Sequence, residues 1–485
     1  MRKLAKSRII IGAASVLSIA AVLAVGLAHF KTASAAGVTI TSHPVSVNPQ
    51  RVPAGNPTGH VFGCQTQLVV GGIVCYSPEQ IRNAYNITPL LNAGITGAGK
   101  SIVIIDAFQN PDMPQDIANF DGAFGLPAPN FTQVAPDGLT PFDPTDANQV
   151  GWAGEITLDV QWSHAVAPGA NIVLVLAKSN QDADILSATK YAVDHRLGDI
   201  ISQSFGENET CVDPTLLKQE HQIFADATLK HMTIFASSGD QGAAQQTCDG
   251  SSWTQVASSP ASDPLVTGVG ATELVASPAC RDAALNEIPC ASGIAAGTYQ
   301  SESALNEAPG LFTAGNFATG GGFSTLYKEP FYQFGSVSHH FQRGVPDVAY
   351  NGAIGHGVLA SFTLGGGFFI FGGTSAGSPQ WAGITALADQ KAGRSLGLIN
   401  PALYLIGNIP PLYKHDFHDT TTGNNSVIEP DANNTPVSVA GFNAGTKWDA
   451  TTGLGTPNAA NLIALIMSFD HDGNDASAVN QLKNH

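Results

Sequence analysis

Apolar strand-like runs alternate with helical stretches through the first half of this chain, and that alternation limits the folds open to it. Residues 102–105, 171–177, 199–206 and 232–236 read as strands, and 171–177 is apolar throughout, as in sheets covered on both faces. The stretches between them carry apolar residues at helical spacing. Strand, helix, strand, helix predicts an α/β protein with a doubly wound parallel sheet and helices on both faces.

The loops at the carboxyl ends of parallel strands are where such a sheet forms its site. Asp106 ends the first predicted strand, Ser204 lies near the end of the third, and Asp240 follows the fourth. We therefore expect the site at this edge of the sheet.

A strand-to-helix turn is predicted at residues 372–379, whose sequence is Gly-Gly-Thr-Ser-Ala-Gly-Ser-Pro. The apolar run 368–371 precedes it, two glycines permit the tight turn, and an apolar helix follows with Pro379 expected in its first turn. Ser375 would then place its hydroxyl near the positive end of a helix, where backbone N–H groups stabilise an oxyanion. A helix N-cap is the alternative role for Ser375.

A serine nucleophile needs a base, and the helical segment 152–162 offers two carboxyl groups. Glu155 and Asp159 are four residues apart, so they share one face of the helix. Like charges at that spacing are mildly destabilising, which favours a functional reason for them. A solvated acidic face is the alternative.

The composition excludes some classes of protein. Of the 485 residues, 43% are hydrophobic and only 12% are charged, so the chain can bury a sizeable core and is not disordered. The formal net charge of −17 opposes binding to a phosphate backbone, and we expect no nucleic-acid partner. An acidic surface is compatible with work at low pH, where fewer carboxylates are ionised.

The N-terminus has the pattern of a secretory signal. Four basic residues precede the apolar run 9–27, and Thr-Ala-Ser-Ala at 32–35 offers a cleavage site after Ala35. We predict a signal peptide over 1–35, a secreted extracellular protein and no stable membrane association after cleavage. An uncleaved anchor is the alternative, because the run approaches the length of a membrane span. Residues 36–75 read as a short leader arm and 471–485 as a polar, frayed tail.

The six cysteines fall into near neighbours along the chain, and a secreted protein favours disulfides between them. Proximity alone suggests three pairs: Cys64 with Cys75, Cys211 with Cys248, and Cys280 with Cys290. Other connectivities stay open.

These features together resemble the sedolisin family of serine-carboxyl peptidases. Glu155 with Asp159, Asp240 at a strand end and Ser375 in Gly-Thr-Ser-x-x-x-Pro stand in that family's order, and further landmarks occur between residues 76 and 469, at 168–170, 202–206, 237–240, 258–260, 320–324, 343–348 and 448–457. The resemblance implies a subtilisin-like fold in a single catalytic domain over 76–470. It also implies a monomeric endopeptidase that hydrolyses peptide bonds of proteins at acidic pH.

Carried over residue by residue, the resemblance makes Ser375 the nucleophile, Glu155 its general base, Asp159 the group that orients Glu155, and Asp240 the oxyanion-side group. The chemistry agrees with these roles. Glu155 accepts a proton only when it is ionised, and Asp240 donates a hydrogen bond only when it is protonated. Both conditions hold together only in acid.

The resemblance also implies one structural Ca²⁺ ion near the C-terminus. Its ligands would be the carboxylates of Asp419 and Asp449 with the carbonyls of Thr420, Gly445 and Lys447, a set of hard oxygens. Lys447 stands where the family usually has glycine, which a special backbone conformation there would explain. The alternative is a transition-metal cluster in the segment 415–419.

Other functions stay open at this point. Residues 373–377 also satisfy Gly-x-Ser-x-Gly, which favours an α/β-hydrolase-type esterase with Asp416 and His418, or Asp419 and His471, as its acid and base. A subtilisin-type triad could use Asp106. An inactive, peptidase-like surface or binding protein is a further alternative. Members of the sedolisin family usually carry a large pro-domain, whereas about forty residues separate Ala35 from Tyr76, so we expect a short leader to suffice or the enzyme to fold without one.

Overall fold

The computed structural model describes residues 50–51, 61–66, 73–284, 286–310, 313–337, 341–469, 475 and 479–480, all within one compact unit. The predicted signal, most of the leader arm and most of the tail lie outside the described residues. No helix in the described part of the chain is long and apolar enough to cross a membrane.

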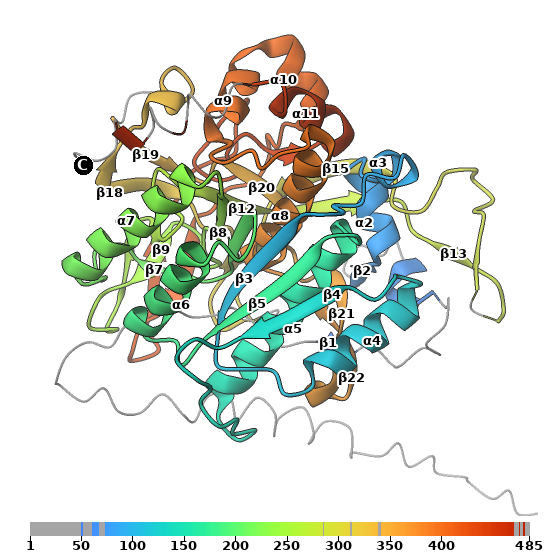
Figure 1. The fold of residues 1–485 in the computed structure, drawn as a ribbon, viewed down its shortest axis with the longest axis horizontal. Helices are drawn as coiled ribbons and strands as arrows, with labels where there is room; N and C mark the ends of the chain where they lie inside the picture. Colours follow the sequence, from blue (N-terminus) through green and yellow to red (C-terminus); the bar gives the residue numbers. More distant parts are fainter. Residues whose placement is uncertain are drawn as a thin grey trace, which may run out of the picture. The chain divides into compact units, whose positions relative to one another are not determined.

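The main sheet confirms the predicted α/β fold. Its strands lie in the order β15-β12-β8-β6-β3-β5-β4, with β20 also paired to β12 (Figure 1). Every neighbouring pair is parallel except β12 with β15. The strands are β3 (Ser101–Ala107), β4 (Asn130–Val134), β5 (Asn171–Ala177), β6 (Ile200–Gln203), β8 (Thr233–Ser237), β12 (Thr267–Ala276), β15 (Tyr299–Ala304) and β20 (Val348–Asn351).

Strand β4 is not among the strands predicted from the sequence. It forms the edge of the sheet, pairing with β5 from Asn130 opposite Asn171 onward. An edge strand has one neighbour and a solvated side, and none of its five residues is buried. It therefore lacks the apolar run that marks the inner strands.

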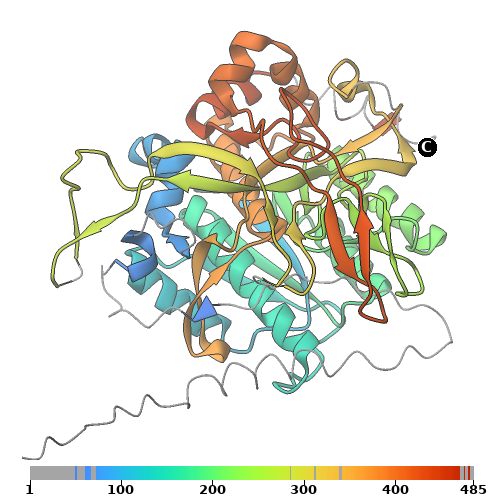
Figure 2. The same ribbon diagram turned by 180° about the vertical axis from the view of Figure 1, so that it is seen from behind.

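Helices cover both faces of this sheet. One layer contains α4 (Met113–Phe124), α5 (Ala147–Val166), α8 (Thr374–Ala392) and α11 (Ala459–Ile466); the other contains α6 (Asp182–Asp194) and α7 (Pro214–Leu229). Strand β3 shows the division: Ile102 and Ile104 join the core under α5 and α8, whereas Val103 and Ile105 join the core under α6 and α7. Figures 1 and 2 show the two layers from opposite sides.

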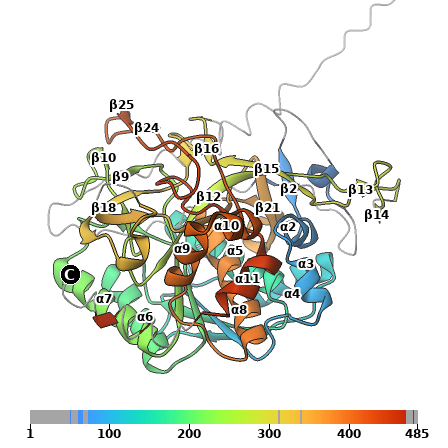
Figure 3. The ribbon, with the colours of Figure 1, turned by 90° about the horizontal axis from the view of Figure 1, so that it is seen from above.

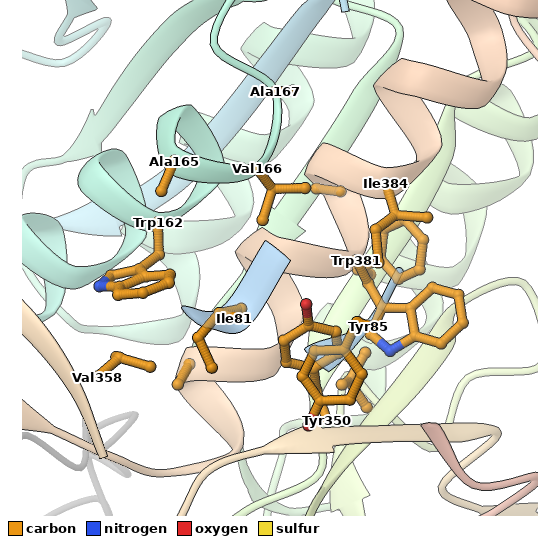
Figure 4. Close-up of a cluster of buried hydrophobic side chains, with 14 of the residues drawn as sticks. Ile81, Tyr85, Trp162, Ala165, Val166, Ala167, Tyr350, Val358, Trp381 and Ile384 are labelled. Atoms are coloured by element: carbon orange, nitrogen blue, oxygen red, sulfur yellow. The ribbon is translucent and has the colours of Figure 1, made fainter. Parts of the chain in front are cut away.

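Side chains of α5 and α8, among them Trp162, Val166 and Trp381, pack together in the core (Figure 4). Trp162 and Trp381 are fully buried, and their indole N–H groups donate to the carbonyls of Leu359 and Ala349 at 2.9 and 3.0 Å. A Cβ on Gly383 would lie 2.7 Å from Val166, so glycine there lets the two helices approach closely. This approach brings the middle of α5 beside the start of α8.

A second, four-stranded sheet leads into α8. Its order is β1 (Gln50–Arg51), β22 (Gly367–Phe371), β21 (His356–Phe362) and β2 (Val74–Tyr76). The predicted strand at 368–371 is therefore confirmed, although it lies in this smaller sheet. The three suggested disulfides are all present, Cys64–Cys75, Cys211–Cys248 and Cys280–Cys290.

Short elements make up the remainder (Figure 3). The helices are α2 (Pro78–Ala84), α3 (Thr88–Asn92), α9 (Asn400–Asn408) and α10 (Pro410–Asp416), with single 3-10 turns η1 (Gly63–Thr66), η2 (Phe331–Gln333) and η3 (Thr363–Gly365). The paired strands are β7 (Glu207–Asn208) with β11 (Ser258–Ser259), β9 (Ala244–Gln246) with β10 (Trp253–Gln255), β13 (Cys280–Arg281) with β14 (Glu287–Ile288), β16 (Asn306–Glu307) with β17 (Phe317–Ala318), β18 (Gly322–Lys328) with β19 (Gln342–Val345), β23 (Phe417–His418) with β26 (Thr456–Pro457), and β24 (Val427–Pro430) with β25 (Pro436–Val439).

Two residues of the predicted frayed tail are packed against the domain. Asp475 and Val479 are each 1% exposed. Asp475 accepts from the backbone N–H of Leu398 and pairs with His231. The prediction of a frayed tail is wrong for these two residues, because Asp475 is held by polar contacts and Val479 joins the core under α6 and α7.

Candidate active site

Ser375 lies at the start of α8, where the sequence placed it. Strand β22 ends at Phe371, Gly373 is the N-cap, and Ser375 is the second residue of the helix. The N-cap role considered for Ser375 is therefore wrong. Gly373 has φ 109°, and a Cβ there would lie 2.7 Å from Asp240 Oδ2, so both its conformation and its surroundings require glycine.

Pro379 lies inside the helix rather than in its first turn. Proline has no N–H, so the carbonyl of Ser375, four residues before it, has no partner within the helix. The Ser204 hydroxyl lies 3.4 Å from that carbonyl oxygen. Pro379 thus leaves the Ser375 carbonyl oxygen able to accept a hydrogen bond from a residue outside the helix.

The two carboxyl groups of α5 are completely buried. Glu155 and Asp159 each have 0% exposure, so the solvated acidic face considered for them is wrong. Asp159 Oδ1 accepts a hydrogen bond from Ser204 Oγ at 2.9 Å. Asp159 Oδ2 and both Glu155 oxygens have no hydrogen bond of good geometry with any described residue.

Ser375 faces this pair. Its hydroxyl is close enough to Glu155 to lower the pKa of that carboxyl, and it lies 3.5 Å from the Ser204 carbonyl oxygen. Ser375 is 3% exposed. The serine hydroxyl therefore lies between one buried carboxyl and one backbone carbonyl.

Burial has the largest effect on the pKa values of the carboxyl groups in this cluster. It raises the pKa of Glu155 well above the ordinary glutamate value, and repulsion from Asp159 adds to the rise. Burial followed by repulsion from Asp106 likewise raises the pKa of Asp159, while the bond from Ser204 lowers it. Because these groups are so close, their protons are shared over the cluster.

Asp106 is a third member of the cluster, and sequence reasoning missed this association. It lies near the end of β3 with 0% exposure, and neither of its oxygens has a partner among the described residues. Burial and then repulsion from Glu155 raise its pKa well above the ordinary value. Its place at a strand end was the available signal, but only the packing of α5 across the sheet brings it to Glu155.

Asp240 follows β8 and lies beside the first residue of α8, close enough to Glu155 to raise the pKa of that carboxyl. Its Oδ1 accepts from the backbone N–H of Thr374 at 2.7 Å and from the Thr374 hydroxyl at 2.8 Å. Its Oδ2 is buried without a partner in the described part of the protein. Burial raises the pKa of Asp240 to about 6, although the two bonds from Thr374 oppose the rise.

The residues considered for an esterase triad have other partners. His418 stacks on Tyr299 with ring centroids 3.9 Å apart, and Asp416, the acid considered with His418, pairs with His415 at 2.7 Å. His471 lies outside the described residues. The side-chain neighbour of the Ser375 hydroxyl is a carboxyl group.

The predicted calcium ligands lie in two adjacent segments. The backbone N–H of Lys447 donates to Asp419 at 3.0 Å, and the N–H of Gly445 donates to Asp449 at 2.9 Å. Lys447 has φ 64°, a left-handed conformation that glycine adopts more easily. Asp419 and Asp449 both lie near Tyr413, and carboxylates with loop carbonyls are the hard oxygen ligands that calcium takes.

Comparisons with known proteins agree with this geometry. The model of the subtilase family (Peptidase_S8) matches residues 149–401. Kumamolisin of Bacillus sp. (strain MN-32) is 32% identical over 404 residues, which cover 81% of this chain and 64% of kumamolisin. Sedolisin of Pseudomonas sp. (strain 101) is 31% identical over 420 residues, 83% of this chain and 64% of sedolisin. The chain thus spans just under two thirds of these relatives.

A solved structure matches the fold. Pseudomonas sedolisin, a serine-carboxyl proteinase complexed with two molecules of pseudo-iodotyrostatin, aligns with a TM-score of 0.65 and 28% identity over 82% of this chain and 99% of that one. The family model covers more than half of the chain, and the relatives agree with it. The chain belongs to the subtilase family and, within it, to the sedolisin family of serine-carboxyl peptidases.

Proposed function

We propose that this protein is a secreted serine-carboxyl endopeptidase that cleaves proteins in acid, with Ser375, Glu155, Asp159 and Asp240 as its catalytic residues. The observation that carries the proposal is the position of the Ser375 hydroxyl. Ser375 lies at the start of α8, and its hydroxyl lies against the buried carboxyl of Glu155. Asp240 supports the proposal, because its Oδ1 accepts from Thr374, the residue before Ser375, and its Oδ2 has no partner among the described residues.

In this mechanism Ser375 Oγ attacks the carbonyl carbon of the substrate peptide while Glu155 takes the hydroxyl proton. Glu155 then gives that proton to the leaving amine as the C–N bond breaks, and an acyl-enzyme remains. Water, deprotonated by Glu155, releases the acyl group. Burial raises the pKa of Glu155, which makes its ionised form a stronger base than a free glutamate.

Asp159 orients Glu155 from the next turn of α5. Ser204 is placed to hold Asp159, because its hydroxyl donates to Oδ1 at 2.9 Å. Asp106, at the sheet, discourages ionisation of both carboxyls and so helps to keep a proton within the cluster. Ser204 and Asp106 are therefore positioning groups rather than reacting ones.

Asp240 sets the alkaline limb of the pH dependence. Below about pH 6, the pKa of this residue, its free Oδ2 carries a proton and can donate to the oxyanion together with the Ser375 backbone N–H. Above that pH the carboxylate repels the developing negative charge. Activity should therefore fall as the pH rises past about 6.

We also propose one structural calcium ion held by the carboxylates of Asp419 and Asp449 and the carbonyls of Thr420, Gly445 and Lys447. A divalent cation would offset the repulsion between the two aspartates and tie the two segments together. The three disulfides support export to an oxidising compartment, as the predicted signal requires. Protein or peptide substrates and a monomeric state complete the proposal.

Hydrolysis of a denatured protein across pH 2 to 8 tests the function, with Ser375→Ala as the matched variant. We expect peptide cleavage that peaks in acid and is absent in the variant, with an unchanged circular dichroism spectrum. Cleavage retained in Ser375→Ala would overturn the catalytic assignment. Ester cleavage near neutral pH, without peptide cleavage in acid, would favour the esterase instead.

A further inference from the structure

The Thr374 hydroxyl lies between two groups of the turn that carries Asp240. The backbone N–H of Gly239 donates to Thr374 Oγ1 at 3.1 Å, and this hydroxyl lies 2.8 Å from Asp240 Oδ1. The N–H of Gly239 can only donate, so the single proton of the hydroxyl is left for another acceptor. Oδ1 is the acceptor that the described residues offer to it.

The two oxygens of Asp240 therefore have different surroundings. Oδ1 also accepts from the backbone N–H of Thr374 at 2.7 Å, so two donors face it. Oδ2 is buried without a partner among the described residues. A protonated carboxyl has one O–H group and one oxygen that only accepts. The oxygen with two donors is the accepting one, and the proton of the neutral acid belongs on Oδ2.

The backbone of this turn is held by other contacts. The N–H groups of Ala318 and Gly320 donate to the carbonyl oxygens of Asp240 and Gly239 at 2.9 and 2.6 Å. The Ser238 hydroxyl donates to the Gly320 carbonyl at 2.8 Å. These bonds fix the main chain from 238 to 240 but do not reach the carboxyl group. The orientation of the carboxyl group thus depends on Thr374.

The oxygen without a partner lies against the turn that carries the nucleophile. A Cβ on Gly373 would lie 2.7 Å from Asp240 Oδ2, and Gly373 is two residues before Ser375. Thr374 stands between these two residues in the chain. By holding Oδ1, it keeps Oδ2 at the start of α8.

Glu155 on α5 is the charged group that acts together with Asp240, since repulsion from Asp240 raises the pKa of Glu155. The segment 318–320 and the start of α8 present backbone groups, glycines and the Thr374 hydroxyl to Asp240. The bonds from Thr374 lower the pKa of Asp240, against the rise caused by burial. Loss of the hydroxyl should therefore raise this pKa.

We propose that Thr374 is a positioning residue for the oxyanion side of the reaction: its hydroxyl and backbone N–H hold Asp240 Oδ1, so that Oδ2 carries the proton given to the oxyanion. Thr374 acts through Asp240 and does not itself touch the reacting atoms. The inference rests on the proposed function, because the role of Asp240 is proposed there.

The pH profile of kcat in Thr374→Val tests the proposal, because valine keeps the shape of threonine and lacks the hydroxyl. We expect kcat in acid to fall by about tenfold or more, and the alkaline limb to move to higher pH. Thr374→Ser keeps a hydroxyl and should restore both the rate and the position of the limb.

Ser378→Ala is the matched control, because it removes another buried hydroxyl of α8, which lies 2.8 Å from Ser202 Oγ. It should leave the alkaline limb where the parent has it. A limb that stays in place in Thr374→Val, or that moves equally in Ser378→Ala, would overturn the inference.

The double variant separates this inference from the proposed function. In Asp240→Asn no carboxyl titrates at this position, so adding Thr374→Val should not move the limb any further. If Asp240→Asn leaves the parent's limb unchanged, the proposed role of Asp240 fails. If Asp240→Asn moves the limb and Thr374→Val does not, only the role of Thr374 fails.

Neutron diffraction from crystals of the deuterated protein locates the proton without an activity assay. At about pH 4, below the pKa of Asp240, we expect a deuteron on Oδ2 and the Thr374 hydroxyl deuteron directed at Oδ1. A deuteron on Oδ1, or a Thr374 hydroxyl directed elsewhere, would overturn the inference whatever the enzyme cleaves.

Discussion

Asp347 and Glu155 are both completely buried, yet donors surround the first, and no donor in the described part of the chain reaches the second with good geometry. The two oxygens of Asp347 accept from both terminal nitrogens of Arg343, from the Tyr404 hydroxyl at 2.8 Å and from the Gly268 backbone N–H at 2.7 Å. Glu155 has the Ser375 hydroxyl beside it and three further carboxyls nearby, those of Asp159, Asp240 and Asp106.

The difference separates structural burial from functional burial. A buried charge is tolerated when a partner and hydrogen bonds replace its water, as they do for Asp347. An unsatisfied carboxyl destabilises the fold and has a strongly raised pKa, which suits proton transfer. We infer that the fold tolerates the instability of the Glu155 cluster for the sake of its chemistry.

Exchanging one carboxyl for an amide in each region should give opposite results, and this is the largest expected effect. Glu155→Gln should lower kcat by about 10⁴-fold, as loss of a triad member does elsewhere, with an unfolding temperature equal to or above the parent's. Asp347→Asn should lower the free energy of unfolding by about 3–5 kcal/mol, because it leaves Arg343 buried without a counter-charge. Turnover per folded molecule should stay near the parent's.

Chemical unfolding at pH 5 and active-site titration measure the two quantities separately. A strong loss of stability in Glu155→Gln, or an Asp347→Asn variant as stable as the parent, would contradict the claim that Asp347 is buried for stability and Glu155 for chemistry.

Ser204→Ala should have the next largest effect. Removing its bond to Asp159 should lower kcat by about 10- to 100-fold, the range for a lost hydrogen bond to a charged group. It should also move the acid limb of the pH profile upward, because this bond lowers the pKa of Asp159. Ser204→Thr keeps a hydroxyl and should restore most of the rate. Equal losses in both variants, with no movement of the limb, would mean that Ser204 acts through packing alone.

Glu429 extends the comparison to a carboxyl far from the proposed chemistry in sequence. It is 4% exposed, its Oε1 has no partner in the described structure, and burial raises its pKa to about 8. A raised folded pKa means that stability is full below the unfolded value, near 4, and is lost as the pH rises towards 8. Glu429→Gln should therefore match the parent at pH 4 and exceed its free energy of unfolding by about 2 kcal/mol at pH 8. Urea titrations at both pH values measure this, and a gain of equal size at pH 4 would contradict it.

Calcium removal should have the smallest effect on the chemistry. Because the proposed ion lies in the C-terminal segments, a chelator at pH 6 should lower the unfolding temperature by several degrees without changing kcat at temperatures where the protein stays folded. In Asp419→Asn the chelator should have little further effect. An unfolding temperature that does not respond to chelator or to added calcium would contradict the proposed calcium ion.

The sequence predicted those parts of the molecule in which one local pattern decides the structure. Strand 171–177 was predicted at its observed bounds because both of its faces are covered, and Ser375 was placed at the start of α8 because its glycines permit only a tight turn. Strand β4 was missed because an edge strand needs no apolar run.

The surroundings of the site residues could not be read from local patterns. Burial of Glu155, and the approach of Asp106 to it, depend on the way α5 crosses the sheet beside α8. The catalytic roles and the calcium ligands came from resemblance to a family and stay predictions. Pro379 was predicted in the first turn of α8 but lies further inside the helix, because the local pattern did not fix the residue at which the helix begins.

The most direct test of the account is the pH dependence of kcat in the parent and in Asp240→Asn. The amide is isosteric: its oxygen can still accept from Thr374, and its NH₂ can donate at every pH. The account predicts that the parent loses activity above about pH 6, the pKa of Asp240, and that the variant keeps its rate to higher pH. An alkaline limb that stays at the same pH in Asp240→Asn would contradict the claim that a protonated carboxyl holds the oxyanion.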